Sequence, residues 1–467
     1  MRLILGVELG EQEVHVVAID SYQSLMAGVS HRGAGRPERL LSKAIAETLR
    51  VVGAQAREIQ YCAVVSDHCS RALRQRRGLA RVALLRLADP AGSAIPPLFS
   101  WPHELVEAIG GSAVAIAGGV DLDGRPIGSL PDEGEILEVI RRLKGSGSEA
   151  LAVTGIFSPV HPQSEVQMAA RIREAMGPDF PILLSHWLGP IGFLERENAA
   201  VLNTALIKVG PTGGELVARV LQSLGAEVPI FVAQNDGTLM SLAQTRRFPL
   251  LTVRSVVAHL LRGAVHLSGR ESGLVLCSGP ETVELGLVEG GFPHESTRPG
   301  TIEGVRVNVA LPEILSIPIT AGHGGWTDGM TERVERLLVQ IKGHAEPMPV
   351  IMAGPLADQV PQQLRGVLRA ERLTNVAWSA AIGAAMAPLG GRADGTYSLE
   401  TWSHEGARAE AVRRAADWAV AAGADPASVQ VVGIDETPFT YLPGNVLRIR
   451  AKVAGKPLIA EPATLSG

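Results

Sequence analysis

Two stretches of the sequence share one pattern: an apolar β-rich run, a small polar turn and a second apolar run. The first is RLILGVELGEQEVHVVAID at the N-terminus, and the second is GLVLCSGPETVELGLVEGGFP, which begins at Gly273. Each predicts a β-hairpin, because strand-like runs joined by a short polar segment pair by turning back on each other. The recurrence near residues 10 and 280 predicts an internally duplicated fold.

Helical and strand patterns alternate along the rest of the chain. Short apolar runs such as ALAVTGIF, PILLS and PIFVAQ each follow a helical stretch. Alternation of this kind is typical of a layered α/β architecture. The predicted helices cover residues 37–52, 132–144, 164–176, 195–208, 214–224, 330–343, 377–387 and 406–422.

Length and composition exclude several classes of protein. The chain has 467 residues, more than one compact core accommodates, so two or three domains are expected. Its formal net charge is −5 and no Lys/Arg cluster interleaves with aromatic residues, so we expect no nucleic-acid partner. No apolar run reaches the roughly 20 residues of a spanning helix, so we expect no membrane partner. The three cysteines fit a reducing compartment, and a cytoplasmic location is expected.

Six stretches carry a family resemblance. LPDEGEILEVIRRL–ALAVTGIFSPVHPQSE, LSHWLGPIGFLERENAAVLNTAL, AQNDGTLMSLAQTRRFPLLTV, EGVRVNVALPEILSI, AIGAAMAPLGG and PFTYLPGN occur in this order over nearly the whole chain. Together they resemble the hydantoinase/oxoprolinase family, specifically its shorter, hydantoinase A-like members. One such match would be weak, whereas six in the same order are hard to obtain by chance.

The resemblance implies an actin-like ATPase fold, with two ribonuclease H-like α/β domains and a nucleotide in the cleft between them. It also implies ATP-dependent opening of cyclic amides such as hydantoins and 5-oxoproline, or a related carboxylase role, usually beside a second subunit. The expected division is an N-terminal actin-like domain over residues 1–180, a second actin-like domain over 181–395, and a C-terminal α/β segment over 396–467 packed on the core.

Each half of the family fold carries a phosphate loop that resembles Asp-x-Gly-Gly-Thr-x-Thr-Asp, and both loops are altered here. The first loop runs from Glu8 to His15 and the second from Cys277 to Glu284. Glutamate, glutamate and histidine replace the leading Asp, the second glycine and the last Asp of the first loop. Cysteine, proline and glutamate replace the same three residues of the second. The predicted nucleotide-loop positions are Gly6, Glu8, Gly10, Glu11, His15, Cys277, Gly279, Pro280 and Glu284.

These replacements oppose phosphate binding. Glu11 would put a carboxylate near a phosphate oxygen, and two unit charges about 4 Å apart repel by about 4 kcal/mol at an effective dielectric near 20. Pro280 removes a backbone N–H donor, and Cys277 is a poor ligand for Mg²⁺. We therefore expect no cofactor, or Mg·ATP if the loops bind phosphate in another way.

Glu8 and Glu284 keep a carboxylate one methylene longer than the family aspartate. They are either the remains of a metal site or solvated turn residues, and the second interpretation is favoured. On the predicted helix 195–208, Glu197 and Asn198 are followed by Asn203, and the spacing places Asn198 within a turn of Asn203. Side chains of this kind anchor a hinge by hydrogen bonds more often than they perform chemistry.

Two polar loops complete the candidates. Gln234, Asn235 and Asp236 follow a strand, where α/β proteins place ligand contacts, although a turn closed by its own side chains explains them equally well. His323 lies in the glycine-rich segment TAGHGG, for which a plain loop is favoured over an anion cradle. The sequence contains no H-E-x-x-H, G-x-x-x-x-G-K-[ST], G-x-S-x-G or C-x-x-C signature, so no catalytic residue is predicted.

Three hypotheses about function remain. The first is a non-ATPase member of the family that acts as a subunit beside a hydantoinase-type partner or as a homo-oligomer. The second is an active cyclic-amide hydrolase or carboxylase subunit that uses Glu8 and Glu284 in place of the aspartates. The third is a small-molecule binding protein that uses the old nucleotide cleft, with Cys277 and His15 as its support.

Overall fold

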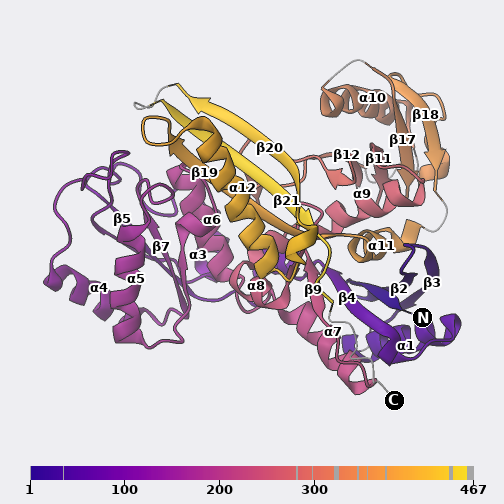
Figure 1. Ribbon diagram of the computed structural model, residues 1–467, viewed down its shortest axis with the longest axis horizontal. Coiled ribbons are helices and arrows are strands. Elements are labelled where there is room, and N and C mark those ends of the chain that lie inside the picture. The colour runs from indigo at the N-terminus through magenta and orange to yellow at the C-terminus, as the bar shows by residue number, and fades with distance from the viewer. Residues whose placement is uncertain are drawn as a thin grey trace.

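A computed structural model describes residues 2–34, 36–279, 282–296, 298–319, 326–343, 346–354, 356–373, 376–440 and 445–459. Pro280 and His323 lie outside these residues. The described part of the chain forms four sheets with helices packed around them (Figure 1). No helix within it is long and apolar enough to cross a membrane.

The largest sheet has nine strands in the order β20-β21-β19-β10-β9-β4-β1-β2-β3. The predicted first hairpin is confirmed, because β1 and β2 pair antiparallel with Leu9 opposite Val14. β4 pairs parallel with β1 on one side and with β9 on the other. The strands are β1 (Leu3–Leu9), β2 (Glu13–Asp20), β3 (Leu25–Arg32), β4 (Ile59–Ser66), β9 (Ile230–Ala233), β10 (Leu239–Ser241), β19 (Leu389–Ser398), β20 (Gln430–Phe439) and β21 (Val446–Gly455).

A second sheet repeats this arrangement and confirms the predicted duplication. β11 and β12 form an antiparallel hairpin, β16 pairs antiparallel with β12, and β17 and β18 continue in parallel from β11. The same relations link β1, β2, β3, β4 and β9 in the first sheet. The second sheet comprises β11 (Gly273–Ser278), β12 (Thr282–Glu289), β13 (Phe292–Pro293), β16 (Ile314–Pro318), β17 (Met348–Ala353) and β18 (Val367–Arg372).

Two helices cross in direct backbone contact between the halves. These are α9 (Ser255–Leu267) and α11 (Ser379–Ala385). A Cβ on Gly263 of α9 would lie 1.8 Å from the carbonyl oxygen of Ser379, and one on Gly383 of α11 would lie 1.9 Å from that of His259. Only glycine permits this approach, so the two small residues set how closely the halves pack.

A four-stranded parallel sheet forms a separate lobe at the left of Figure 1, in the order β6-β5-β7-β8. Its strands are β5 (Val82–Asp89), β6 (Ser112–Ala117), β7 (Ala150–Gly155) and β8 (Ile182–Leu184). The helices α3 (His103–Ala108), α4 (Glu133–Ser146), α5 (Gln163–Met176) and α6 (Phe193–Ala205) accompany it. The alternation predicted between residues 130 and 208 is therefore confirmed as one α/β layer.

The C-terminal segment extends the large sheet. β19 and β21 pair antiparallel along ten residues, and β20 adds the outer edge. α12 (His404–Ala421) begins at Ser403, whose side chain accepts from the Gly406 N–H. α12 packs on β19 through buried alanines at four-residue spacing, namely Ala407, Ala411, Ala415 and Ala419. The large sheet takes strands from all three predicted segments, and the boundaries at 180 and 395 stay predictions.

The remaining helices cover the two sheets of the duplicated halves. α1 (Pro37–Val52) has the predicted bounds, with proline in its first turn and Gly53 in the left-handed conformation after its end. The others are α2 (His68–Gln75), α7 (Thr212–Ser223), α8 (Leu242–Arg247) and α10 (Asp328–Lys342), and a small separate ladder joins β14 (Gly300–Ile302) to β15 (Val305–Val307).

Candidate functional site

Three parallel strands end at one edge of the large sheet and bring several predicted residues together. Leu9 at the end of β1 pairs with Ser66 at the end of β4, and Val64 of β4 pairs with Val232 of β9. The first hairpin loop, Asp67 and the segment 234–236 therefore follow one another along this edge. In α/β sheets the carboxyl ends of parallel strands are where ligands bind.

The first hairpin loop closes on itself. The Gly10 N–H donates to the Glu13 carbonyl oxygen at 2.9 Å, and Glu11 is exposed in the turn. Gly6 has a packing role instead, because a Cβ there would lie 2.1 Å from the carbonyl oxygen of Ala381 in α11. The Gly10 N–H is thus not free to join an anion-binding nest.

Carboxylates gather beside this loop. Glu8, Glu13 and Asp67 form what we call the acid cluster. Burial, followed by the negative charges of Asp67 and Glu13, raises the pKa of Glu8 to about 8. Arg71 pairs with Asp67 at 2.7 Å and Arg32 pairs with Glu13 at 2.6 Å. Glu8 is therefore largely protonated at neutral pH, while its two acidic neighbours each have a cation.

His15 lies opposite Glu8 in the hairpin ladder. Its Nδ1 is 2.8 Å from Ser30 Oγ, which also accepts from Trp378 Nε1 at 2.8 Å. Burial lowers the pKa of His15, although Glu13 acts in the opposite direction. His15 is therefore tied to β3 through Ser30, and its Nε2 lies 3.5 Å from Glu13 Oε2 beside the turn.

The second hairpin repeats the closed geometry. The Gly279 N–H donates to the Thr282 carbonyl oxygen at 2.7 Å, and Cys277 lies opposite Glu284. Burial raises the pKa of the Cys277 thiol to about 12, with a further contribution from Glu284. Burial also raises the pKa of Glu284, against the effect of Arg254. Cys277 is therefore a protonated thiol and not a ligand poised for a metal.

A cavity of about 270 Å³ lies between α2 and the start of α9. Asp67, Arg254 and Glu303 are among its lining residues. The Arg254 backbone N–H donates to Ser70 Oγ at 3.1 Å, and its guanidinium donates to the Thr301 carbonyl oxygen at 3.0 Å. Arg254 is the charge that links this cavity to Glu284, because Glu284 and Glu303 both act on its pKa.

The structure gives Glu8 and Glu284 different electrostatic neighbours. Glu8 is surrounded by Glu13 and Asp67, whereas Glu284 faces Arg254. Among the described residues no group of three or more His, Cys, Asp or Glu side chains could hold a metal ion. A metal site that joins Glu8 to Glu284 stays a prediction.

Two of the polar residues predicted on α6 join neighbouring elements. Glu197 receives two hydrogen bonds from Arg86 of β5, at 2.8 and 2.5 Å, and both side chains are 1% exposed. Asn198 accepts from Trp101 Nε1 at 2.7 Å and donates to the Arg306 carbonyl oxygen at 2.8 Å. These contacts anchor the four-stranded lobe.

The third, Asn203, holds the short helical turn Pro249–Thr252. Its amide donates to the Arg247 carbonyl oxygen at 2.9 Å and accepts from the Leu250 N–H at 3.1 Å. The Arg247 guanidinium lies 3.9 Å from the ring centre of Trp187. Through Arg247 and the turn Pro249–Thr252, Asn203 helps to position Trp187 and Leu251. Both residues line a second cavity, and Asn203 does not.

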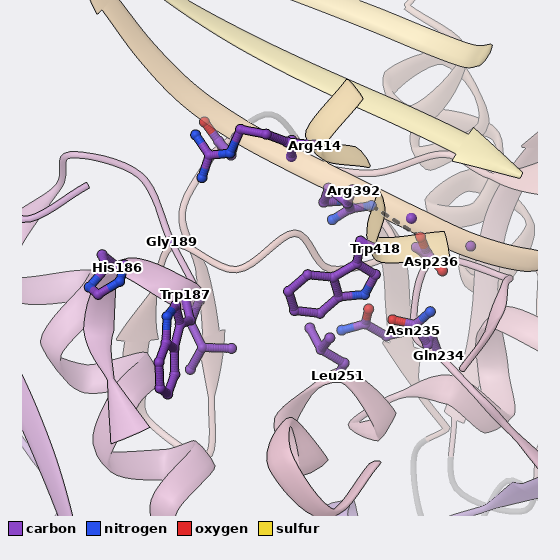
Figure 2. Close-up of a pocket in the computed structure, with 15 residues that line it drawn as sticks. His186, Trp187, Gly189, Gln234, Asn235, Asp236, Leu251, Arg392, Arg414 and Trp418 are labelled. Atoms are coloured by element: carbon purple, nitrogen blue, oxygen red, sulfur yellow. Dashed lines mark hydrogen bonds and ion pairs between the residues drawn. The ribbon is translucent and has the colours of Figure 1, made fainter. Parts of the chain in front are cut away.

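This second cavity has a volume of about 170 Å³ and lies between the residues after β9 and the start of β19, and we call it the β9–β19 cavity. Figure 2 shows its lining: Trp187 and Trp418 on its sides, Leu251 below, and Arg392 and Arg414 above. The predicted Gln234, Asn235 and Asp236 all line it. None of the described phosphate-loop residues does.

Four charged side chains form a compact group behind the cavity. Arg392 lies 3.4 Å from Asp236 and 2.5 Å from Glu295, and Lys452 lies 3.5 Å from Asp236 and 2.8 Å from Glu295. We call these four residues the ion quartet. Burial alone would raise the pKa of Asp236, but Lys452 and Arg392 outweigh it and hold that pKa well below its usual range. Asp236 is therefore ionised and its charge is balanced.

Asn235 differs from its neighbours because its side chain has an unused donor. It is 2% exposed, and its Nδ2 has no hydrogen-bond partner among the described residues. Its backbone N–H donates to the Leu251 carbonyl oxygen at 2.8 Å, so the residue is held in place. Gln234, in contrast, directs its amide to Thr238 Oγ1 at 3.1 Å and to the Leu239 carbonyl oxygen at 3.2 Å.

A buried network supports the wall of the cavity formed by His186. The His186 Nδ1 lies 2.6 Å from Glu165 Oε2, and Ser185 Oγ donates to Glu165 Oε1 at 2.6 Å. Arg196 Nε donates to Ser185 Oγ at 2.9 Å. Glu165 and Arg196 are each less than 1% exposed. No motif in the sequence indicates that these residues form one network.

Sequence reasoning also missed Arg392, Arg414 and Trp418. The family-like motif AIGAAMAPLGG ends at Gly391, directly before Arg392, and is the signal that could have drawn attention to this strand. The contact between Arg392 and Asp236 joins residues that lie 156 positions apart in the chain. Such a pairing becomes visible only when β19 and β9 are placed in one sheet.

The two repeated sheets with their hairpins define an actin-like ATPase architecture, as predicted. The ATP-dependent caprolactamase from Pseudomonas jessenii has the same fold, with a TM-score of 0.75 at 14% identity over 99% of this chain and 90% of that one. The nucleotide-free structure of an ATP-dependent acetone carboxylase matches with a TM-score of 0.68 at 13% identity, over 98% of this chain and 88% of that one.

Residues 7–176 match the family described as the hydantoinase/oxoprolinase N-terminal region. The predicted resemblance to the hydantoinase/oxoprolinase family is thereby confirmed. No curated protein matches the chain by sequence.

Proposed function

We propose that this chain is a hydantoinase/oxoprolinase-family protein that does not hydrolyse ATP and serves as a subunit of a hydantoinase-type complex. The acid cluster carries the proposal. Glu8, Glu13 and Asp67 interact electrostatically at the edge where the family places its phosphates, and the pKa of Glu8 is raised to about 8 as a result of burial and these neighbours. A site that already disfavours one negative charge disfavours a polyphosphate more strongly.

Mg²⁺ would not readily reverse this effect. The ion prefers carboxylate oxygens and would need at least one of these side chains as a ligand. Asp67 and Glu13 already pair with Arg71 and Arg32, so at these two residues a metal would have to displace a cation, and at the protonated Glu8 it would have to displace a proton. The closed turns at Gly10 and Gly279 add to the cost, because both N–H groups already donate within their hairpins.

A second candidate is a small-molecule binding protein that uses the old cleft. The protonated Glu8 carboxyl favours it, because a neutral carboxyl both donates and accepts hydrogen bonds. The cavity of about 270 Å³ beside Asp67 and Arg254 offers room for such a ligand. This candidate requires an uncharged or singly charged ligand.

The test is calorimetric titration of the purified chain with Mg·ATP, beside a variant that carries Glu11→Gly and Pro280→Gly. We expect no heat of binding from the native chain. Micromolar binding with turnover would overturn the proposal in favour of an active cyclic-amide hydrolase or carboxylase subunit. Binding gained only by the variant would show that these two positions close the site.

The subunit role is tested separately by light scattering. The purified chain is measured alone and after mixing with a hydantoinase-type partner subunit. We expect a complex whose mass equals the sum of the two subunits. A homo-oligomer that ignores the added partner would contradict the hetero-complex while leaving the nucleotide result unchanged.

A further inference from the structure

We propose that a third cavity of the structure binds a small acyclic dicarboxylate, held by the guanidinium groups of Arg298 and Arg450. The cavity has a volume of about 290 Å³ and lies between the start of α6 and the strands β19 and β21, and we call it the α6–β21 cavity. The inference goes beyond the proposed function and does not rest on it, because no described phosphate-loop residue lines this cavity.

The first observation is a row of cations on β21. Arg448, Arg450 and Lys452 occupy alternate positions of the strand, so they share one face of the sheet. The two outer cations have close carboxylate partners. Arg448 donates to Asp394 at 2.8 and 2.5 Å, and Lys452 lies 2.8 Å from Glu295.

The middle cation, Arg450, lacks such a partner. Asp394 stands opposite Arg450 in the strand ladder, but both of its oxygens accept from Arg448. Among the described residues the one carboxylate contact of Arg450 is with Asp435, at 4.0 Å, and that carboxylate is 75% exposed. A long ion pair with an exposed group contributes little, so the charge of Arg450 is left without an effective partner.

The Arg450 guanidinium is also within reach of a ligand. The side chain lines the cavity and is 20% exposed. Its nitrogens make no hydrogen bond within the described part of the chain, and none of them is sealed from solvent. A guanidinium presents five N–H donors in a planar fork that matches a carboxylate, so an entering carboxylate would gain charge-assisted hydrogen bonds.

Arg298 supplies a second positive charge. Its side chain is exposed, its backbone N–H donates to Ser296 Oγ at 3.3 Å, and its guanidinium has no carboxylate partner among the described residues. The other charged residues of the lining are already paired, as Arg392–Glu295, Arg448–Asp394 and Glu195–Arg306. The cavity therefore carries two positive charges that two carboxylates would balance.

An apolar part of the lining favours a ligand with a hydrocarbon body. Leu188, Ile191, Leu251 and Val309 all line the cavity. Each methylene group that they cover would add to affinity, whereas a hydrated inorganic anion gains nothing from such a surface. Succinate and glutarate combine two carboxylates with a short methylene chain and serve as the probes.

The experiment is calorimetric titration of the full chain with succinate, glutarate, monomethyl succinate or inorganic phosphate. We expect saturable binding of at least one dicarboxylate, with an affinity that falls as salt is added. Monomethyl succinate is expected to bind about tenfold more weakly, because it retains one charge of the two. Phosphate should also bind more weakly, because it has no hydrocarbon body.

Arg450→Gln tests the named contact and should lower the affinity for the dicarboxylate about tenfold or more. Arg298→Gln changes an exposed side chain and should have the same effect, so it serves as the test if Arg450→Gln does not fold. The matched control is Arg77→Gln, which removes the same charge from an exposed residue outside the cavity and should leave binding unchanged.

Four results would overturn the proposal. Neither dicarboxylate might saturate the chain, or the monomethyl ester could bind as tightly as succinate, which would exclude a site for two carboxylates. Tighter binding of phosphate would define a site for an inorganic anion instead. An equal loss of affinity in Arg77→Gln would mean that the dicarboxylate responds only to the overall charge of the chain.

Discussion

The acid cluster and the ion quartet lie along one edge of the same sheet, yet they treat a buried carboxyl group in opposite ways. Glu8 is surrounded by acids, and its pKa rises to about 8. Asp236 is surrounded by Arg392 and Lys452, and its pKa falls well below the usual range. Burial raises the pKa of a carboxyl group in both places, so the neighbours decide the outcome.

This difference separates what each region can bind. The acid cluster resists further negative charge, which opposes a nucleotide. The ion quartet pairs two cations with two carboxylates, beside a cavity lined by Asn235, Trp187 and Trp418. The electrostatic environment thus differs from one strand end to the next along the same edge.

The largest effect is expected from Arg392→Ala, which breaks the quartet. Asp236 and Glu295 would then share Lys452 alone, and loss of one partner of a buried ion pair costs about 3 kcal/mol or more. Chemical denaturation at pH 7 measures the loss in the free energy of unfolding. Arg171→Ala, which removes an exposed pair with Glu133, should cost less than about 1 kcal/mol. Equal losses would mean that the quartet is no stronger than a surface pair.

A comparable effect, with a distinctive pH dependence, is expected from Glu8→Gln. The native chain holds more protons at Glu8 than the unfolded chain between the unfolded pKa and about 8. Its free energy of unfolding should therefore fall as pH rises through this window, by up to about 1.4 kcal/mol per pH unit. The variant should lack this component. Glu11→Gln in the exposed turn should retain it, and a native curve that rises from pH 5 to 8 would be inconsistent with a protonated Glu8.

The smallest effect is expected from Arg71→Ala, which removes the cation beside Asp67. The pair is partly exposed, so the loss of stability at pH 7 should be about 1 kcal/mol or less. Asp67 would then act on Glu8 without compensation, and the fall in stability with pH should extend to higher pH. Arg77→Ala on an exposed neighbouring residue serves as the control. A shift of the window to lower pH would reverse the assigned role of Asp67.

Much of the fold could be predicted from local sequence patterns. The hairpins near residues 10 and 280 and the helix Pro37–Val52 follow from apolar runs, turns and caps that lie within about twenty residues of one another. The actin-like architecture was predicted from the resemblance of the six motifs to the family. The order of the four-stranded lobe could not be read from the sequence, because strand order depends on which apolar faces pack together in space.

The site was predicted only in part, for a similar reason. Gln234, Asn235 and Asp236 were found because they follow a strand, and the structure places them in a cavity. Their partners Arg392 and Trp418 come from distant segments and carry no motif of their own. The raised pKa of Glu8 also depends on Asp67, which reaches it only through the parallel pairing of β1 and β4.

The protonation state of Glu8 is measured most directly by a ¹³C NMR titration of the glutamate side-chain carboxyls, with the Glu8 signal identified by its absence from the Glu8→Gln spectrum. We expect Glu8 to titrate near pH 8 in the folded chain, so that this edge of the sheet holds a neutral carboxyl among acids. Titration near the ordinary glutamate value of about 4.3 would contradict it. Glu8 would then be ionised at neutral pH, and its acidic neighbours would not be expected to exclude a nucleotide from this edge.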